Sequence, residues 1–177
     1  DGFLKIEPFA VEALVQQMEE DGIRVLLGAS VEAVSRQGAT VTVRLASGAQ
    51  ITGSELILAT GRVPATDDVG LETVGLTPGQ RIDVNDHLVV SGVEGDWLYA
   101  VGDVISTPQL AHVGFAEGMF AVRDLLGESP APLDPETVPW CIYSHPEVAF
   151  AGMTEEAARA AGHEVVVSSH RFAGNGR

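Results

Sequence analysis

Two glycines in this sequence stand at the end of an apolar segment, and each is followed by a charged residue. The first step is Gly61 with Arg62, and the second is Gly102 with Asp103. In open α/β sheets ligands bind beyond the carboxyl ends of the strands, so both steps are candidate binding positions. A glycine allows a ligand to approach the backbone closely, and an aspartate carboxylate can accept hydrogen bonds from sugar-like hydroxyls.

A helix is expected directly after the second step, over about residues 109–126. Residues 106–108, Ser-Thr-Pro, offer a capped start, and Gly127 stands where the helix would stop. The first N–H groups of such a helix carry a partial positive charge, which stabilises an anion. They would point at whatever lies near Leu110, Ala111 and His112. Taken alone, the unit could equally be an ordinary turn with a capping acid.

The first hundred residues otherwise alternate between helix and strand patterns. A helix is expected over residues 7–21, because apolar positions recur there at helical spacing, namely Phe9, Leu14, Val15 and Met18. Turn residues separate the expected strands, which cover residues 23–27, 30–35, 40–45, 50–59, 82–84, 88–90 and 97–101. The stretch from Glu55 to Thr60 has the continuous apolar character of a strand that is covered on both faces.

A proline-rich linker over residues 130–135 indicates a domain boundary. Beyond it we expect a strand over residues 138–143, a helix over 154–161 and a strand over 164–170. The fold class expected for the whole chain is therefore α/β.

Composition and charge exclude several classes of function. Ten Lys and Arg against 25 Asp and Glu give a formal charge of -15, which repels nucleic acid and anionic membrane surfaces. The apolar runs are far shorter than the roughly 20 residues that span a bilayer, and no signal segment opens the chain. We therefore expect no nucleic acid partner, no membrane partner and a cytoplasmic location.

The cysteine and histidine content gives no metal site. The single cysteine, Cys141, cannot form an internal disulfide, and its apolar strand-like surroundings predict a small core residue. The histidines outside the candidate site have no metal-ligand spacing and are expected in loops or on the surface, namely His87, His145, His163 and His170.

Several segments occur in the order and approximate spacing found in one known family. They are Ala59–Pro64, Leu98–Asp103 with Leu110–His112 and Glu117–Gly118, and Tyr143–Glu147. On these residues the chain resembles the flavoprotein pyridine nucleotide-disulfide oxidoreductases. The closing segment, residues 171–177, and the His-Pro-Glu step make it most similar to the dihydrolipoamide dehydrogenases within that family.

This resemblance implies two cofactors, FAD and NAD(P), and places residues around them. Asp103, after Gly102, would hold the ribityl chain of FAD, and the backbone around Leu110, Ala111 and His112 would lie beside the flavin. Gly61 would face the nicotinamide dinucleotide. The resemblance implies no catalytic residue within this sequence. Ala65 stands where the family usually has Asn, which departs from the pattern.

The resemblance also divides the chain. Residues 1–62 would be the second half of a nicotinamide-dinucleotide domain, residues 63–128 the returning part of a Rossmann-like FAD domain, and residues 135–177 the start of an α+β dimerisation domain. The parent protein would be a homodimer that oxidises a small dithiol such as dihydrolipoamide, with electrons passing through a cysteine pair and FAD to NAD.

Three motifs of a complete family member are absent from this sequence. They are the two Gly-x-Gly-x-x-Gly turns that cradle dinucleotide phosphates and the redox-active cysteine pair. We therefore expect an incomplete portion that is inactive alone. Two alternatives stay open: a related reductase of mercuric ion, quinone or a low-molecular-weight disulfide, and a folded interaction or dimerisation module without catalysis.

Overall fold

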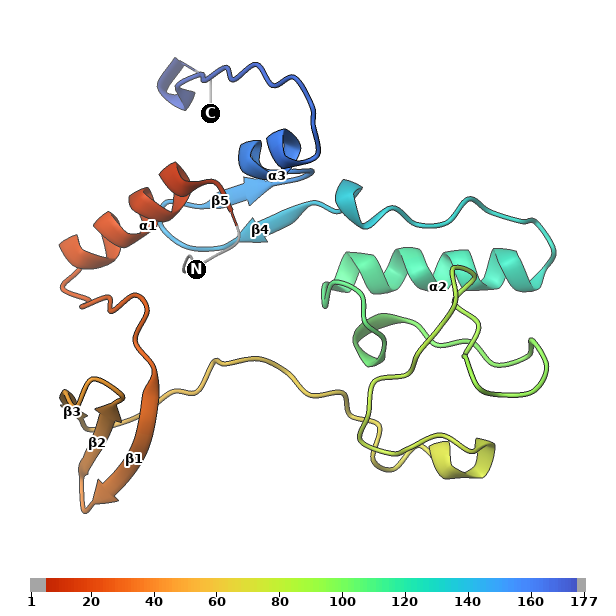
Figure 1. Cartoon of the computed structure of the whole chain (residues 1–177), viewed down its shortest axis with the longest axis horizontal. Coiled ribbons are helices and arrows are strands. Elements are labelled where there is room, and N and C mark those ends of the chain that lie inside the picture. The colour runs from red at the N-terminus through yellow and green to blue at the C-terminus, as the bar shows by residue number, and fades with distance from the viewer. Residues whose placement is uncertain (1–5, 175–177) are drawn as a thin grey trace. The chain divides into compact units, whose positions relative to one another are not determined.

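The computed structural model describes residues 6–174, without the side chain of Ala173. It has a mixed α/β content and two compact units. One unit combines the ranges Asp1–Leu58 and Pro139–Arg177, and the other is Ala59–Val138. Figure 1 shows the order of the elements along the chain, and each unit is described by itself.

Helix α1, Pro8–Glu20, opens the first unit close to its expected bounds. Pro8 takes the first turn, where its missing N–H costs no hydrogen bond. The buried positions are Ala10 and Leu14, one helical turn apart. Phe9 was expected on the same face but is 72% exposed, since a residue next to Ala10 lies about 100° around the helix.

Three antiparallel strands follow in the order β1-β2-β3. Their bounds are Val31–Gln37, Thr40–Leu45 and Gln50–Gly53. Tight turns at Gly38 and Gly48, both with positive φ, join them as the sequence predicts. The buried strand residues, Val41 and Leu45, both lie on the central strand β2. This small sheet confirms the expected hairpin but shortens the last strand.

One expected strand and the second half of another do not form. Residues 23–27 are irregular, and the apolar stretch 55–60 is extended but unpaired, with Ile57 89% exposed and Leu58 75% exposed. A strand needs a neighbour for its backbone hydrogen bonds. Within residues 6–174 no strand lies beside this stretch, so the prediction of a doubly covered strand over 55–60 is wrong for this chain.

The C-terminal part of the first unit contains a short ribbon and a helix. Strand β4, Trp140–Ile142, pairs with β5, Val148–Phe150, and the rings of Trp140 and Phe150 stack with centroids 6.0 Å apart. Strand β5 was not expected. Helix α3, Glu155–Ala160, begins as expected at Thr154, whose hydroxyl accepts a hydrogen bond from the N–H of Ala157.

Two predictions in this region are wrong. Cys141 is exposed rather than part of the core, because the two-stranded ribbon offers no second layer to cover it. Residues 164–170 form no strand, since nothing among the described residues pairs with them. A short 3₁₀ turn, η4, covers Phe172–Gly174.

The second unit is a loop-rich body around one long helix, α2, Ala111–Leu125. It also has three 3₁₀ turns, η1 over Leu71–Val74, η2 over Gly102–Val104 and η3 over Pro135–Thr137. The strands expected over 82–84, 88–90 and 97–101 appear only as isolated bridges, which pair Val84 with Val90 and Val89 with Tyr99. The buried core consists of Leu88, Val90, Ala100, Ile105, Phe120 and Ala121.

Among residues 6–174 no helix combines the length and the apolar character needed to cross a lipid bilayer.

Candidate functional site

The Gly102–Asp103 step forms the 3₁₀ turn η2 in the second unit. Val101 before it is extended, and Gly102 then adopts a φ of 75°. Only glycine enters this left-handed region without a steric cost. A Cβ added at Gly102 would meet nothing within 4 Å, so the backbone there faces open space. The side chain of Asp103 is 54% exposed. The turn therefore presents an uncovered backbone and a half-exposed carboxylate.

The turn is fastened to helix α2 by a buried acid. Glu117 is 1% exposed, and its Oε2 accepts a hydrogen bond from the N–H of Gly102 at 2.6 Å. One helical turn earlier, a Cβ added at Gly114 would lie 3.5 Å from the Cα of Gly102. That distance is an ordinary van der Waals contact, so the turn lies directly beside the helix at Gly114. By contrast, a Cβ at Gly118 would meet nothing within 4 Å.

Helix α2 begins without a side-chain cap. Its N-cap is Leu110, which donates its own N–H to the carbonyl of Pro108 at 2.8 Å. The Ser-Thr-Pro segment was expected to cap the helix, but it lies in the preceding loop. Ala111 and His112 are exposed at the first helical positions. The helix therefore offers an accessible, partially positive end beside the turn, which suits a negatively charged ligand.

Two polar side-chain atoms in the loop between turn and helix are buried without a partner. They are the hydroxyl Oγ1 of Thr107 and the amide Nε2 of Gln109. Leaving a buried polar group unsatisfied costs about 1–3 kcal/mol. Such atoms call for a missing partner, and their place between Asp103 and α2 indicates a ligand with hydrogen-bonding groups.

Two arginines hold Asp103 from other parts of the chain. Nη1 of Arg62 lies 3.7 Å from Oδ2 of Asp103, which is a loose ion pair. Nη1 of Arg81 donates to the carbonyl oxygens of Asp103, at 3.2 Å, and Ile105, at 2.8 Å. Gly61, with a φ of 138°, precedes Arg62 and is exposed. The chain thus brings the surroundings of both glycine steps together at Asp103.

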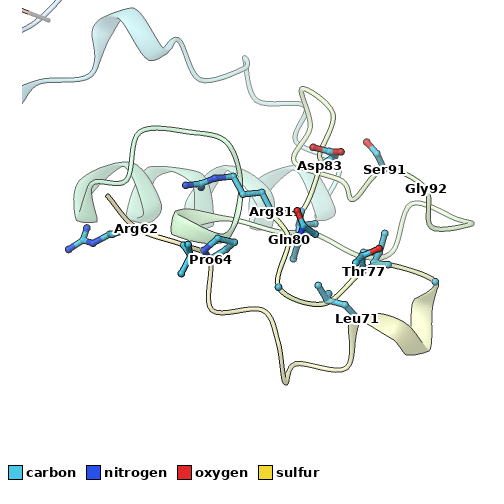
Figure 2. Close-up of a pocket in the computed structure, with 14 residues that line it drawn as sticks. Arg62, Pro64, Leu71, Thr77, Gln80, Arg81, Asp83, Ser91 and Gly92 are labelled. Carbon is cyan, nitrogen blue, oxygen red and sulfur yellow. The ribbon is translucent and has the colours of Figure 1, made fainter. Parts of the chain in front are cut away.

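A pocket of about 1000 Å³ borders this site (Figure 2). Its lining includes Arg62, Pro64, Gln80, Arg81 and Asp83. Neither Asp103 nor any residue of α2 lines it. The pocket therefore meets the candidate site only through the two arginines, and the turn and helix end face open solvent instead.

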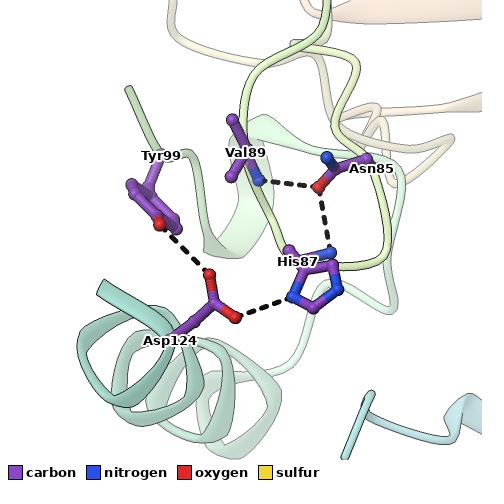
Figure 3. A network of polar contacts seen from close by, with 5 residues as sticks. All are labelled: Asn85, His87, Val89, Tyr99 and Asp124. Carbon is purple, nitrogen blue, oxygen red and sulfur yellow. Dashed lines mark hydrogen bonds and ion pairs between the residues drawn. The ribbon is translucent and has the colours of Figure 1, made fainter. Parts of the chain in front are cut away.

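A separate polar network stabilises the other end of α2 (Figure 3). The carboxylate of Asp124 accepts hydrogen bonds from Nδ1 of His87 at 2.7 Å and from the hydroxyl of Tyr99 at 3.1 Å. The bond from His87 lowers the pKa of Asp124. Burial, and then the hydrogen bond to Asp124, raises the pKa of Tyr99. This network shapes the unit rather than the site.

Sequence reasoning passed over Glu117 and Arg81 as members of the site. The signal for Glu117 was present, because it lies in the apolar stripe of α2 with Val113, Phe120 and Ala121. An acid in such a stripe needs a buried partner. No comparable signal marks Arg81, whose carbonyl acceptors depend on the path of a loop. Among the described residues no cluster of acidic, histidine or cysteine side chains is arranged to hold a metal ion.

Comparisons with known proteins match most of the chain. Residues 3–118 match the family described as Pyridine nucleotide-disulphide oxidoreductase, and residues 138–177 match its dimerisation domain. A dihydrolipoyl dehydrogenase from Cupriavidus necator is 38% identical over 168 residues, which are 92% of this chain and 35% of that protein. One from Bacillus subtilis is 34% identical over 166 residues, 90% of this chain and 34% of that protein.

Three other similarities concern a different reductase and two solved structures. A mercuric reductase from Staphylococcus aureus is 29% identical over 94% of this chain and 31% of its own length. The crystal structure of LpdA from Mycobacterium tuberculosis has a TM-score of 0.77 and 29% identity, covering 89% of this chain and 34% of that one. The flavoprotein disulfide reductase RclA from Escherichia coli, in its Cu(II) complex, has a TM-score of 0.77 and 25% identity, covering 92% and 37%.

Proposed function

Because the chain belongs to the pyridine nucleotide-disulphide oxidoreductase family, we propose that it forms part of an FAD-dependent enzyme that couples a dithiol to NAD(P). The chain spans about a third of the length of the curated relatives it matches. Members of the family use FAD and NAD(P). The relatives named dihydrolipoyl dehydrogenase support oxidation of dihydrolipoamide with NAD as the reaction of the whole protein.

The observation that carries this proposal is the Gly102–Asp103 turn, which is hydrogen-bonded to Glu117 and lies beside the uncapped N-terminus of helix α2. Its features fit a flavin nucleotide: an outward carboxylate that can accept from ribityl hydroxyls, a bare backbone and a partially positive helix end. The buried, unpartnered atoms of Thr107 and Gln109 add hydrogen-bonding groups that a ligand can satisfy.

In this proposal each residue of the site has a binding role. Asp103 accepts hydrogen bonds from the ribityl chain, and Gly102 lets the cofactor approach the backbone. The backbone of Leu110, Ala111 and His112 lies beside the flavin ring and stabilises negative charge there. Gly61 faces the nicotinamide dinucleotide. None of these side chains is a catalytic residue.

When bound, FAD supplies the two-electron chemistry that links dithiol oxidation to reduction of the nicotinamide. This chain contributes the position of the cofactor. Its one cysteine, Cys141, cannot supply a redox-active pair. We propose that the 177 residues alone do not oxidise a dithiol with NAD(P).

The same proposal assigns three domains. Residues 1–62 belong to the nicotinamide-dinucleotide domain, residues 63–128 to the FAD domain and residues 135–177 to the dimerisation domain. The match of residues 138–177 to a dimerisation domain supports a homodimer. A different substrate for the same cofactors, mercuric ion, is the second candidate, and the similarity to a mercuric reductase favours it.

The test is a titration of the apoprotein, expressed from its complete reading frame, with FAD, followed by flavin fluorescence. Wild-type protein is expected to bind FAD, and Asp103→Asn to weaken binding roughly tenfold or more, because a charged acceptor becomes neutral. The matched control is Asp86→Asn, which changes an exposed aspartate of the same unit and is expected to bind as wild type.

Two results contradict the proposal. One is a wild-type protein that takes up no FAD, and the other is an Asp103→Asn variant whose affinity equals that of Asp86→Asn. Turnover of dihydrolipoamide against mercuric ion by the same protein then separates the two candidate substrates.

A further inference from the structure

We infer that Glu117 is a positioning residue of the flavin site, which holds the Gly102–Asp103 turn on helix α2 and thereby sets where the Asp103 carboxylate stands. The inference rests on the proposed function, because it concerns the same site. It gives a structural role to a buried acid that takes no part in the proposed reaction.

The first argument is the cost of burying this side chain. Glu117 is 1% exposed, and its neighbours on the buried face of α2 are apolar, namely Val113, Phe120 and Ala121. Burying a carboxylate costs free energy that an apolar residue of similar size avoids. Stability of the core therefore gives no reason for an acid at this position. The need for a specific hydrogen-bond acceptor for the N–H of Gly102 explains the acid.

The second argument is the geometry of the turn. The N–H of Gly102, just before Asp103, donates to Oε2 of Glu117 at 2.6 Å, a short, charge-assisted bond. The carbonyl oxygens of Asp103 and Ile105 accept from Arg81. The backbone N–H before Asp103 is thus held by the carboxylate of Glu117, and the carbonyls at and after Asp103 are held by the guanidinium of Arg81. The carboxylate itself is left exposed, and its one ion pair is the loose contact with Arg62 at 3.7 Å, so the position of the backbone largely sets where it points.

The third argument is the helix that carries Glu117. The same helix begins at Ala111, where the proposed second contact to the flavin lies. Gly114 lies between these positions, and a Cβ added there would be 3.5 Å from the Cα of Gly102, so the turn lies beside this part of the helix. One hydrogen bond therefore fixes the distance between the two parts of the site, the carboxylate and the helix end. A shift of the turn along the helix would change both contacts together.

Three variants test this role in the protein expressed from its complete reading frame. Glu117→Ala removes the acceptor, and Glu117→Gln keeps a carbonyl acceptor of the same reach without the charge. Phe120→Leu is the matched control, because it disturbs the same buried face but leaves the Gly102 bond intact.

Three measurements read the result. They are the dissociation constant for FAD, the visible absorption and circular dichroism of the bound flavin, and the amide proton resonance of Gly102 in the apoprotein. Glu117→Ala is expected to weaken FAD binding roughly tenfold, change the flavin spectrum and move the Gly102 resonance upfield. Glu117→Gln is expected to lie between Glu117→Ala and wild type in all three.

Phe120→Leu is expected to lower the melting temperature while FAD affinity and spectrum stay close to wild type. The inference is overturned if both Glu117 variants keep wild-type affinity and spectrum, or if Phe120→Leu changes them as much. Failure of wild-type protein to bind FAD contradicts the proposed function instead. In that case the Gly102 resonance still reports the hydrogen bond between Gly102 and Glu117. A resonance that is unchanged in both Glu117→Gln and Glu117→Ala contradicts that bond.

Discussion

Nδ1 of His87 lies 2.7 Å from Oδ1 of Asp124, which fastens the loop after Asn85 to the last turn of α2. A carboxylate can only accept, so His87 carries the proton on Nδ1. An acid in the last turn opposes the helix dipole, and the donors from His87 and Tyr99 offset that cost. The Asp124 side chain is 15% exposed, so water screens the contact only in part.

This contact predicts a pH-dependent stability. The pKa of Asp124 is lowered in the folded protein from its ordinary value of 3.8, so its ionised form favours folding. That stabilisation is present above the ordinary pKa and is lost as the pH falls through the folded value. Asp124→Asn should therefore melt below wild type near neutral pH, and the difference should shrink as the pH falls below the ordinary value of 3.8. Thermal unfolding followed over this range checks it, and a constant difference would count against it.

At alkaline pH, stability is expected to change in the opposite direction and to fall as the pH rises. The pKa of Tyr99 is raised from its ordinary value of 10.0, so the unfolded chain loses this proton first and stability falls as the pH rises above that value. Asp124→Asn removes part of the cause and should make the alkaline loss shallower. Asp86→Asn serves as the control for both the acidic and the alkaline measurement.

A second prediction concerns the buried hydroxyl of Thr66. This side chain is 1% exposed and donates to the carbonyl of Gln80 at 2.8 Å. Thr66→Val should destabilise the unit by about 1–2 kcal/mol, because the carbonyl loses its donor. The control is Thr73→Val, since the exposed Thr73 donates to Gly70 at 2.6 Å but water can replace it. Urea unfolding should show the larger loss for Thr66→Val, and equal losses would refute the argument.

A third prediction compares two glycines of the second unit. Gly102→Ala places a side chain at a φ of 75° and should cost about 1–2 kcal/mol through backbone strain, although the space is open. Gly118→Ala lies inside α2 with nothing within 4 Å and should stabilise by about 0.5–1 kcal/mol through helix propensity. Unfolding free energies of the two variants with the same sign would disprove this reading.

The helices were predictable from the sequence because their signals are local. Apolar spacing, Pro8, Gly127 and the cap at Thr154 each act within a few residues, and α1, α2 and α3 lie close to their expected bounds. The strand β2 was predicted with its correct bounds for the same reason, because glycine turns enclose it on both sides.

The strands that fail to form, and the burial of those that do, could not be predicted from local pattern. An apolar run such as 55–60 becomes a strand only beside another strand, and the exposure of Ile57 shows what happens without one. The exposure of Cys141 has the same origin, because burial depends on a second layer.

The sequence singled out Gly102 and Asp103 as candidate site residues, which stays a prediction, but it did not indicate the contacts that hold them. Gly102 and Asp103 stand out by type and position, whereas the contacts from Arg62 and Arg81 come from residues more than 20 positions away. Of these contacts, only that of Glu117 has a signal in the sequence, because this acid lies within an apolar stripe of the helix.

The bond between Gly102 and Glu117 closes a loop of only 15 residues. Closing a loop of this size takes on the order of 10–100 ns, far less than most domains need to fold. Turn, loop and first helical turns can therefore assemble as soon as α2 forms, without waiting for distant segments.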